Sequence, residues 1–280
     1  PKMVRLATMN LTLRGLPNVR ILLRNVLTTT LDAERKAALG LPEGGYHVVL
    51  ANPPFSGRVD RDRIVDDVKV GSTTATELLF LKYMVDSLRP GGRCAVIVPE
   101  GVLFGSTGAH KELRRQLIEN HSVQAVLSLP GGVFQPYSGV KTSVLFLRRG
   151  GSTQELLFLH ADNDGYRLDA NHDVAIAQDD LPALMAAYRS RDERLAEWRQ
   201  VFPPLPRAGE GRGEGQRPPP AEWNHNWWFA DTATLRANDF NLSAGRYRPL
   251  SQAQVEHQDP RELLAELAAI EAEIAEEVEA

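Results

Sequence analysis

The stretch that decides the fold is Val48-Val49-Leu50-Ala51-Asn52-Pro53-Pro54-Phe55, in which a short apolar run ends in a polar, proline-containing loop. An uninterrupted apolar run of this kind is typical of a strand that is buried on both faces, as in a parallel sheet. Open sheets of parallel strands keep their chemistry in the loops at the carboxyl ends of the strands. The stretch therefore predicts an α/β fold with a functional loop at residues 52–55.

The loop at residues 52–55 combines two hydrogen-bond acceptors with an aromatic ring. Asn52 supplies a side-chain oxygen and Pro53 a main-chain carbonyl, and the two prolines restrict the backbone that carries them. Phe55 adds the ring. This set can hold a planar amine, such as the exocyclic amine of a base turned out of its helix. Asn-Pro and Pro-Pro pairs also mark ordinary turns, so a plain turn is the alternative interpretation.

Short apolar strands alternate with amphipathic helices up to residue 150, which predicts parallel strands with helices on both faces. Right-handed crossovers place the carboxyl ends of such strands on one rim. The loops after Ala51, Val98 and Leu129 are therefore expected to share a crevice. The predicted strands cover residues 19–23, 46–51, 93–98, 123–129 and 142–147, and the predicted helices cover residues 3–13, 33–39, 74–88 and 110–120.

Four regions are expected along the chain. Residues 1–150 form a catalytic domain, and residues 151–202 form a peripheral extension with a strand at 155–160 and a helix at 181–198. Residues 203–222 are rich in Pro and Gly and predict a flexible linker, with a basic binding arm as the alternative. Residues 223–280 end in a helix at 260–278 with coiled-coil spacing. We expect that helix to dock on a partner, and packing on its own domain is the alternative.

Composition narrows the classes of protein further. The single cysteine, Cys94, rules out an internal disulfide and is typical of a cytoplasmic protein. No apolar stretch approaches the roughly 20 residues that span a bilayer. The net charge of −4 is opposite to the basic surface of an independent nucleic-acid binder. A DNA-binding function would therefore need a partner that supplies most of the phosphate contacts.

Five motifs, taken in this order and spacing, resemble those of the modification subunit of type I restriction-modification systems, an adenine-specific DNA methyltransferase. The resemblance covers residues 3–150 and 241–248. The motifs are Arg5-Leu6-Ala7-Thr8-Met9-Asn10-Leu11, the stretch at 48–55, the stretch from Gly91 to Phe104, the stretch from Leu129-Pro130-Gly131-Gly132 through Lys141-Thr142 to Phe146, and Asn241-Leu242-Ser243 with Arg246-Tyr247.

The resemblance implies a Rossmann-like class I methyltransferase sheet whose last strand is antiparallel, S-adenosylmethionine as methyl donor and a flipped adenine as acceptor. The catalytic set is then Asn52, Pro53, Pro54 and Phe55, in which the first two accept the amine hydrogens and the ring stacks on the base. No metal is required.

The implied partners are DNA, a specificity subunit, a second modification subunit and a restriction subunit that can join them. The candidate substrate-binding residues are Phe134, Tyr137 and Lys141, with loop or core packing as the alternative for the two aromatics. The polar loop at 56–72 is expected to be mobile and to face the target, with an ordinary solvated loop as the alternative.

The resemblance is incomplete at the cofactor site. Family members carry a Gly-rich loop and a carboxylate upstream of the first motif, and neither is present in this sequence. Asn25 stands where the family usually has an Asp that contacts the cofactor's adenine. We therefore expect an amino-terminally truncated domain that binds S-adenosylmethionine poorly by itself. The alternatives are a non-catalytic remnant or assembly module, and a methyltransferase that acts on a protein glutamine or on an RNA base amine.

Overall fold

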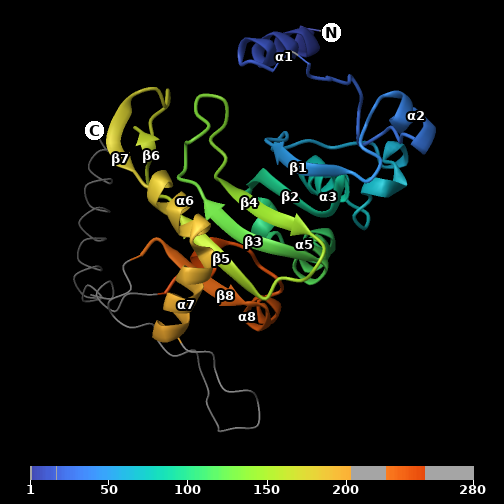
Figure 1. Cartoon of the computed structure of the whole chain (residues 1–280). Coiled ribbons are helices and arrows are strands. Elements are labelled where there is room, and N and C mark those ends of the chain that lie inside the picture. Colours follow the sequence, from blue (N-terminus) through green and yellow to red (C-terminus); the bar gives the residue numbers. More distant parts are fainter. Residues whose placement is uncertain (1, 17, 203–224, 250–280) are drawn as a thin grey trace, which may run out of the picture. The chain divides into compact units, whose positions relative to one another are not determined.

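The computed structural model describes residues 2–16, 18–202 and 225–249 (Figure 1). The chain divides into two compact units, of which the first comprises residues 1–195 and 226–247 and contains the main sheet. The second unit comprises residues 196–225 and 248–280 and falls largely outside the described residues. The predicted linker at 203–222 and the predicted tail helix at 260–278 also lie outside them.

A six-stranded sheet with the strand order β1-β2-β4-β3-β5-β8 forms the centre of the first unit (Figure 1). Strands β1, β2, β3 and β5 run in one direction, whereas β4 and β8 are antiparallel to their neighbours. The predicted mixed, mostly parallel sheet with an antiparallel β4 is therefore confirmed. The strands are β1 Tyr46–Ala51, β2 Leu88–Pro99, β3 His121–Ser128, β4 Thr142–Arg149, β5 Glu155–His160 and β8 Trp227–Asp231.

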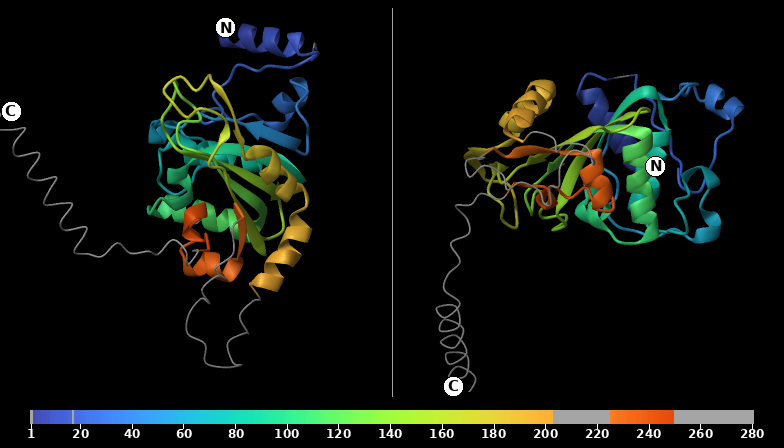
Figure 2. Two further views of the ribbon diagram at one scale, coloured as in Figure 1. Left: turned by 90° about the vertical axis from the view of Figure 1, so that its left-hand side faces the viewer. Right: turned by 90° about the horizontal axis from the view of Figure 1, so that it is seen from below.

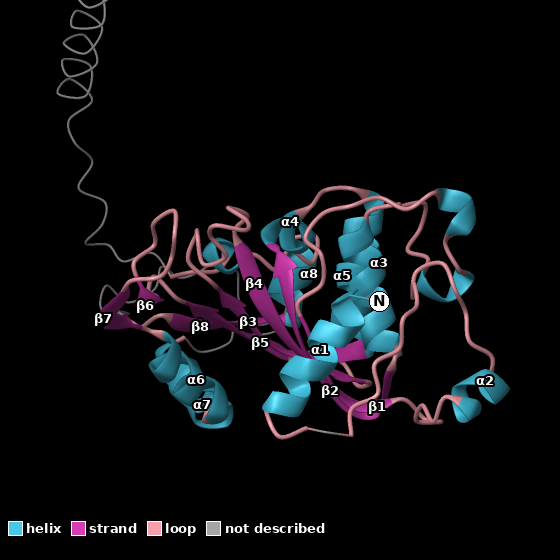
Figure 3. Ribbon diagram, turned by 90° about the horizontal axis from the view of Figure 1, so that it is seen from above, coloured by secondary structure: helices cyan, strands magenta, loops and turns pink. Residues whose placement is uncertain are grey.

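Helices cover both faces of this sheet. α3 (Thr76–Asp86) and α5 (Gly108–Asn120) lie side by side on one face, and α6 (Leu181–Arg189) lies on the other (Figure 3). The predicted helix at 181–198 is divided at Ser190 into α6 and α7. The remaining elements are α1 Lys2–Leu13, α2 Ala33–Ala38, α4 Glu100–Phe104, α7 Arg191–Val201, α8 Thr232–Ala237 and the hairpin of β6 Asp164–Tyr166 with β7 Ala175–Asp179. In the described part of the chain, every helix is too short or too polar to cross a lipid bilayer.

The predicted strand at 19–23 does not form. A strand persists where a neighbouring strand satisfies its backbone N–H and C=O groups, and among the described residues β1 pairs only with β2. The face of β1 is also uncovered, because Val48 is 46% exposed and Leu50 is 78% exposed. α1 likewise buries none of its residues. The first 50 residues therefore present an uncovered apolar surface next to the free edge of β1.

Strand β8 is not predicted by the sequence pattern, although it completes one edge of the sheet beside α8 (Figure 2). Trp228 is fully buried, and its ring stacks on Phe158 of β5 with 6.4 Å between the centroids. The run of three aromatic residues at 227–229 is typical of a strand. The run stands alone just after the Pro-rich segment, outside the region where strands and helices alternate. The sequence pattern therefore does not mark it as a strand of the sheet.

The polar loop at 56–72 is partly packed, which differs from the expectation of a mobile loop. It contains the short 3-10 helices Arg61–Arg63 and Asp66–Val68. Ile64 and Val68 are buried in a cluster with Leu27 and Leu79. The sequence suggests a solvated loop because apolar residues are sparse in it, but these few are enough to anchor its second half on α3.

Candidate active site

The loops that follow β1 and β2 and the loop that precedes β4 lie along one rim of the sheet. Asn52 follows β1 directly, and Glu100 follows β2. The N–H of Glu100 donates a hydrogen bond of 3.0 Å to the carbonyl of Lys141, which precedes β4. The rim is a consequence of strand direction, because β4 runs antiparallel to β2 and β3 and begins where these two strands end. The structure thus brings together the loops that were expected to share a crevice.

Phe55 and Phe134 meet across this rim. Their rings form an edge-to-face contact with 5.2 Å between the centroids and 70° between the planes. Contacts of this geometry are favourable beyond the area they bury, and they fix the direction of both rings. The loop at 52–55 and the glycine-rich loop at 130–139 are therefore joined through their aromatic residues.

The two acceptors of the loop at 52–55 are available to a ligand. Asn52 is exposed, and its side-chain amide makes no hydrogen bond with another described residue. The carbonyl of Pro53 likewise accepts no hydrogen bond from the described backbone. An asparagine in an ordinary Asx turn would bond to its own backbone, as Asn25 does to the N–H of Leu27 at 3.0 Å. The plain-turn interpretation is therefore less favoured.

The other candidate substrate-binding residues differ in their placement. The Tyr137 side chain is 93% exposed, and no ring contact joins it to Phe55 or Phe134. It belongs to a tight turn in which the N–H of Tyr137 donates to the carbonyl of Phe134 at 2.9 Å. The Lys141 ammonium lies on the rim itself. The structure therefore places Phe134 against Phe55, Lys141 on the rim beside Glu100, and Tyr137 in solvent.

A polar cluster on the rim is absent from the sequence prediction. The Glu100 carboxylate lies 3.3 Å from the Lys141 ammonium and accepts a hydrogen bond of 3.2 Å from the Ser128 hydroxyl. Ser128 is 2% exposed and ends β3, so three strands contribute to the cluster. Glu100 and Lys141 belong to two separate motifs and Ser128 lies outside the motifs, so no local pattern links the three residues. The Pro99-Glu100 pair at the end of a predicted strand was the available signal.

The candidate cofactor residue Asn25 stands apart from the loop at 52–55. Asn25, the candidate cofactor residue, lies next to Arg24 and Val26, which line a cavity of about 450 Å³ at the amino ends of β1 and β2, opposite the rim. At Gly92 a side chain would come within 2.7 Å of the Tyr46 carbonyl, so this glycine permits close packing of β1 and β2 at that end. Neither feature provides a cradle beside Asn52.

The only thiol in the sequence is not available for nucleophilic chemistry. Cys94 is 3% exposed on β2, and burial raises its pKa to about 12. The thiolate is the reactive form, so the thiol is inert at neutral pH. Within the described ranges, no three His, Cys, Asp or Glu side chains lie close enough together to hold a metal ion.

Comparison with known proteins identifies the family of this chain. The sequence profile of the family described as N-6 DNA Methylase matches residues 1–257. The chain belongs to this family. As a member of the N-6 DNA methylase family, it carries the Asn-Pro-Pro-Phe loop at the rim and the sheet order described above.

Two relatives of this family member are named as type I restriction enzyme methylase subunits. The chain is 37% identical to the EcoEI methylase subunit of Escherichia coli over 122 residues, which are 43% of this chain and 24% of that protein. It is 30% identical to the EcoKI methylase subunit of E. coli strain K12 over 213 residues, which are 74% of this chain and 36% of that protein. The chain thus spans 36% or less of the length of these two relatives.

A solved structure from a study of the assembly and conformational transition of the type I R-M system superimposes with a TM-score of 0.58 at 28% identity. The match covers 98% of this chain and 50% of the solved chain. The likeness therefore extends over nearly all of the sequence, and it supports the class I methyltransferase fold that the motifs predict.

Proposed function

We propose that this chain is the part of a type I modification subunit that binds the acceptor base, and that the complete subunit methylates adenine in DNA. Membership of the N-6 DNA methylase family supports the exocyclic amine of adenine as the target. The observation that carries the proposal is the pair of unengaged acceptors at Asn52 and Pro53 beside the ring of Phe55.

The amine of a flipped adenine would donate its two hydrogens to the Asn52 side-chain oxygen and the Pro53 carbonyl. Two acceptors in fixed positions draw the nitrogen lone pair out of conjugation with the ring. They also stabilise the positive charge that grows on the nitrogen during methyl transfer. Pro54 restricts the backbone of Pro53 and thereby fixes its carbonyl. Phe55 would stack on the base, and Phe134 would hold the orientation of that ring.

The methyl donor in this proposal is S-adenosylmethionine, held by polypeptide other than the described residues. Support for this donor comes from membership of the N-6 DNA methylase family. We also propose that the protein works on DNA together with a specificity subunit, a second modification subunit and a restriction subunit. The net charge of −4 favours such an arrangement, because partners would supply most of the phosphate contacts.

The test is methyl transfer by the full-length protein, together with any subunits that copurify with it, from tritiated S-adenosylmethionine to unmethylated genomic DNA. Asn52→Ala should lower the rate about 100-fold or more while the unfolding temperature stays unchanged, because Asn52 is exposed and bonds to no described residue. Asn18→Ala, at another exposed asparagine, is the control and should retain the rate. An Asn52→Ala variant as active as the unaltered protein would refute the proposal.

A second candidate function uses the same loop on a protein glutamine amide or on an RNA base amine. The match to the N-6 DNA Methylase profile over residues 1–257 favours DNA. A panel of DNA, RNA and protein substrates with the tritiated donor separates these classes. The further alternative, a non-catalytic assembly module, predicts no heat and no thermal protection when S-adenosylmethionine is titrated into the complex.

A further inference from the structure

We propose that Glu100 is a positioning residue that holds the Lys141 ammonium, so that this ion pair, whose two charges balance, donates a hydrogen bond to a ring nitrogen of the bound adenine. The inference rests on the proposed function, and it adds a residue that neither the loop at 52–55 nor the aromatic contact supplies.

The geometry of the pair leaves the ammonium partly free. The Glu100 side chain is 18% exposed, whereas that of Lys141 is 46% exposed, and their charged atoms lie 3.3 Å apart. Ser128 donates to the same carboxylate oxygen at 3.2 Å. The buried hydroxyl of Ser128 therefore helps to fix the position of the Glu100 carboxylate. A lysine ammonium has three N–H groups, so engagement with Glu100 leaves others for a ligand.

Strand register places these groups on a single face of the sheet. Ser143 of β4 lies opposite Ser128 of β3 and opposite Val98 of β2. Residues that lie directly opposite each other share a face, as do residues two apart along a strand, so Lys141 and Glu100 continue this face beyond the strand ends. The Ser143 hydroxyl is 1% exposed and has no hydrogen-bond partner among the described residues. The buried residues on this face next to Glu100 and Lys141 therefore include polar side chains.

Charge balance favours a base over a phosphate as the ligand. A lysine that binds DNA phosphates contributes a net positive charge, whereas Lys141 is neutralised by Glu100 and adds almost none. A donor whose charge is balanced by a neighbouring carboxylate suits a neutral acceptor, and adenine carries ring nitrogens on both sides of its amine.

The position of β2 supports the same ligand. β2 lies between β1, which carries Asn52, and β4, so these two strands are about 10 Å apart. A base bound at Asn52, together with the extended side chain of Lys141, is long enough to bridge the distance between these two strands.

The experiment compares Glu100→Gln, Lys141→Met and the double variant of the full-length protein and its copurifying subunits. Glu100→Gln keeps the shape of the side chain and should lower kcat about 10-fold, because the ammonium loses its anchor. It should also tighten DNA binding several-fold, because a negative charge is removed beside the DNA. Lys141→Met should lower kcat about 10- to 100-fold, and the double variant should be no slower than Lys141→Met.

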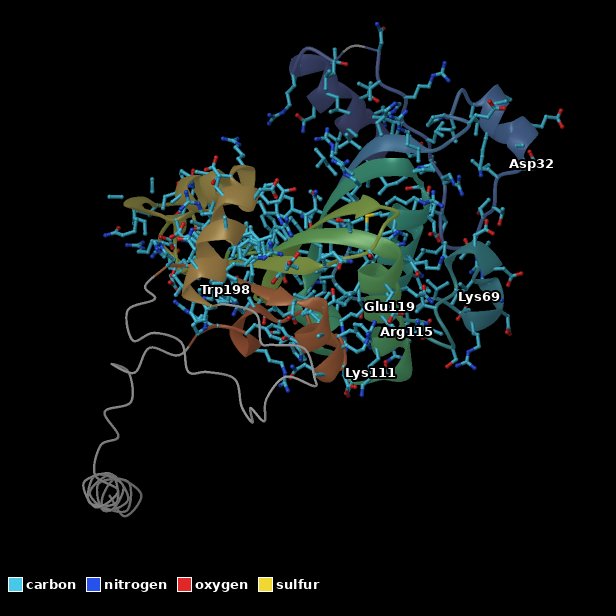
Figure 4. All side chains as sticks on the ribbon, turned by 60° about the horizontal axis from the view of Figure 1, so that its bottom comes forward. Asp32, Lys69, Lys111, Arg115, Glu119 and Trp198 are labelled. Atoms are coloured by element: carbon cyan, nitrogen blue, oxygen red, sulfur yellow. The ribbon has the colours of Figure 1, made fainter. Side chains whose placement is uncertain are left out.

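Lys111→Met is the matched control. Lys111 lies on α5 (Figure 4) and pairs with Asp239 at 2.7 Å, and its side chain is 44% exposed, close to the value for Lys141. This variant should keep kcat. Ser128→Ala, which removes the support of the carboxylate, should lower kcat less than Glu100→Gln does.

The opposite changes in kcat and in DNA affinity distinguish positioning from a merely structural role, which would weaken both. Unchanged kcat in Glu100→Gln, or additive losses in the double variant, would overturn this inference while leaving the role of Asn52 intact. If the unaltered protein transferred no methyl group to DNA, both the proposed function and this inference would be refuted.

Discussion

The guanidinium of Arg114 on α5 donates a hydrogen bond of 2.9 Å to the carbonyl of Phe240, which lies 126 residues further along the chain. Arg114 is 2% exposed, and it also donates to the carbonyls of Gly105 at 2.9 Å and Val102 at 3.2 Å. Phe240 has a φ of 52°, a strained value for a residue other than glycine. The arginine therefore fastens a strained turn after α8 to the helices that follow the rim.

Arg114→Met should destabilise the fold strongly, because it leaves several buried carbonyls without a donor. We expect a loss of about 3 kcal/mol or more in the free energy of unfolding, measured with urea. Arg115→Met is the control, since the Arg115 side chain is exposed on α5 and, among the described residues, pairs with Glu112 and Glu119. Figure 4 labels Arg115 and Glu119. Equal stability of the two variants would contradict this account of the turn.

Adjacent glycines at the entry to β1 should respond differently to alanine. Gly45 has a φ of 93°, and a Cβ there would lie 2.7 Å from the Ser87 carbonyl oxygen. Gly45→Ala should therefore cost about 2–4 kcal/mol of unfolding free energy. Gly44→Ala should change stability little, because a Cβ at Gly44 meets nothing within 4 Å. Chemical denaturation of the two variants checks the difference, and the reverse order would contradict the close approach of this turn to β2.

The two aromatic residues of the glycine-rich loop should differ in their contribution to methyl transfer. Phe134→Ala removes the edge contact at 5.2 Å that orients Phe55 and should slow transfer about 10-fold. Tyr137→Ala should leave the rate within about twofold, because the Tyr137 ring is 93% exposed and loses no contact with Phe55. Initial rates with tritiated donor decide, and a larger effect of Tyr137→Ala would show that the base lies elsewhere.

The thiol of Cys94 should be unreactive in the folded protein. Burial raises its pKa to about 12, so the reactive thiolate is scarce at pH 8. We expect negligible reaction with a disulfide reagent under native conditions and complete reaction of one thiol in denaturant. Rapid native labelling would show that β2 opens readily, because Cys94 is 3% exposed.

Stability should fall as the solution is acidified from pH 8 to pH 5, in part through His121. Burial lowers the pKa of His121, and its Nδ1 accepts a hydrogen bond of 3.1 Å from the N–H of Gly150. The unfolded state then binds the proton more tightly, so stability is retained above the ordinary histidine pKa and is lost below it.

His121→Asn keeps an acceptor in place of Nδ1 and should flatten this dependence. His47→Asn, at an exposed position of β1, should not change it. Thermal unfolding across the pH range is the measurement, and equal slopes for the His121→Asn variant and the unaltered protein would exclude His121 as the source.

Local pattern was sufficient to predict the rim and its principal loop. The apolar run before Asn52 and the glycine-rich connection before Thr142 specify strand direction, and both predictions are confirmed. The sequence could not reveal the contact between Glu100 and Lys141, because it depends on which strands become neighbours. The prediction of a strand at 19–23 was wrong because strand formation also depends on a neighbouring strand. The residues there favour β-structure, but no described strand lies beside them to pair with.

The edge of β1, which no other described strand covers, has a practical consequence for work with the isolated chain. The main-chain N–H and C=O groups along this edge, which pair with no described strand, can form hydrogen bonds with a strand of a second molecule. The exposed Leu50 next to them adds an apolar contact. We expect the purified chain to stay dispersed only when dilute and to form aggregates rich in intermolecular β-structure as its concentration rises. Infrared spectra recorded over a concentration series, and repeated after Leu50→Lys, would report that change.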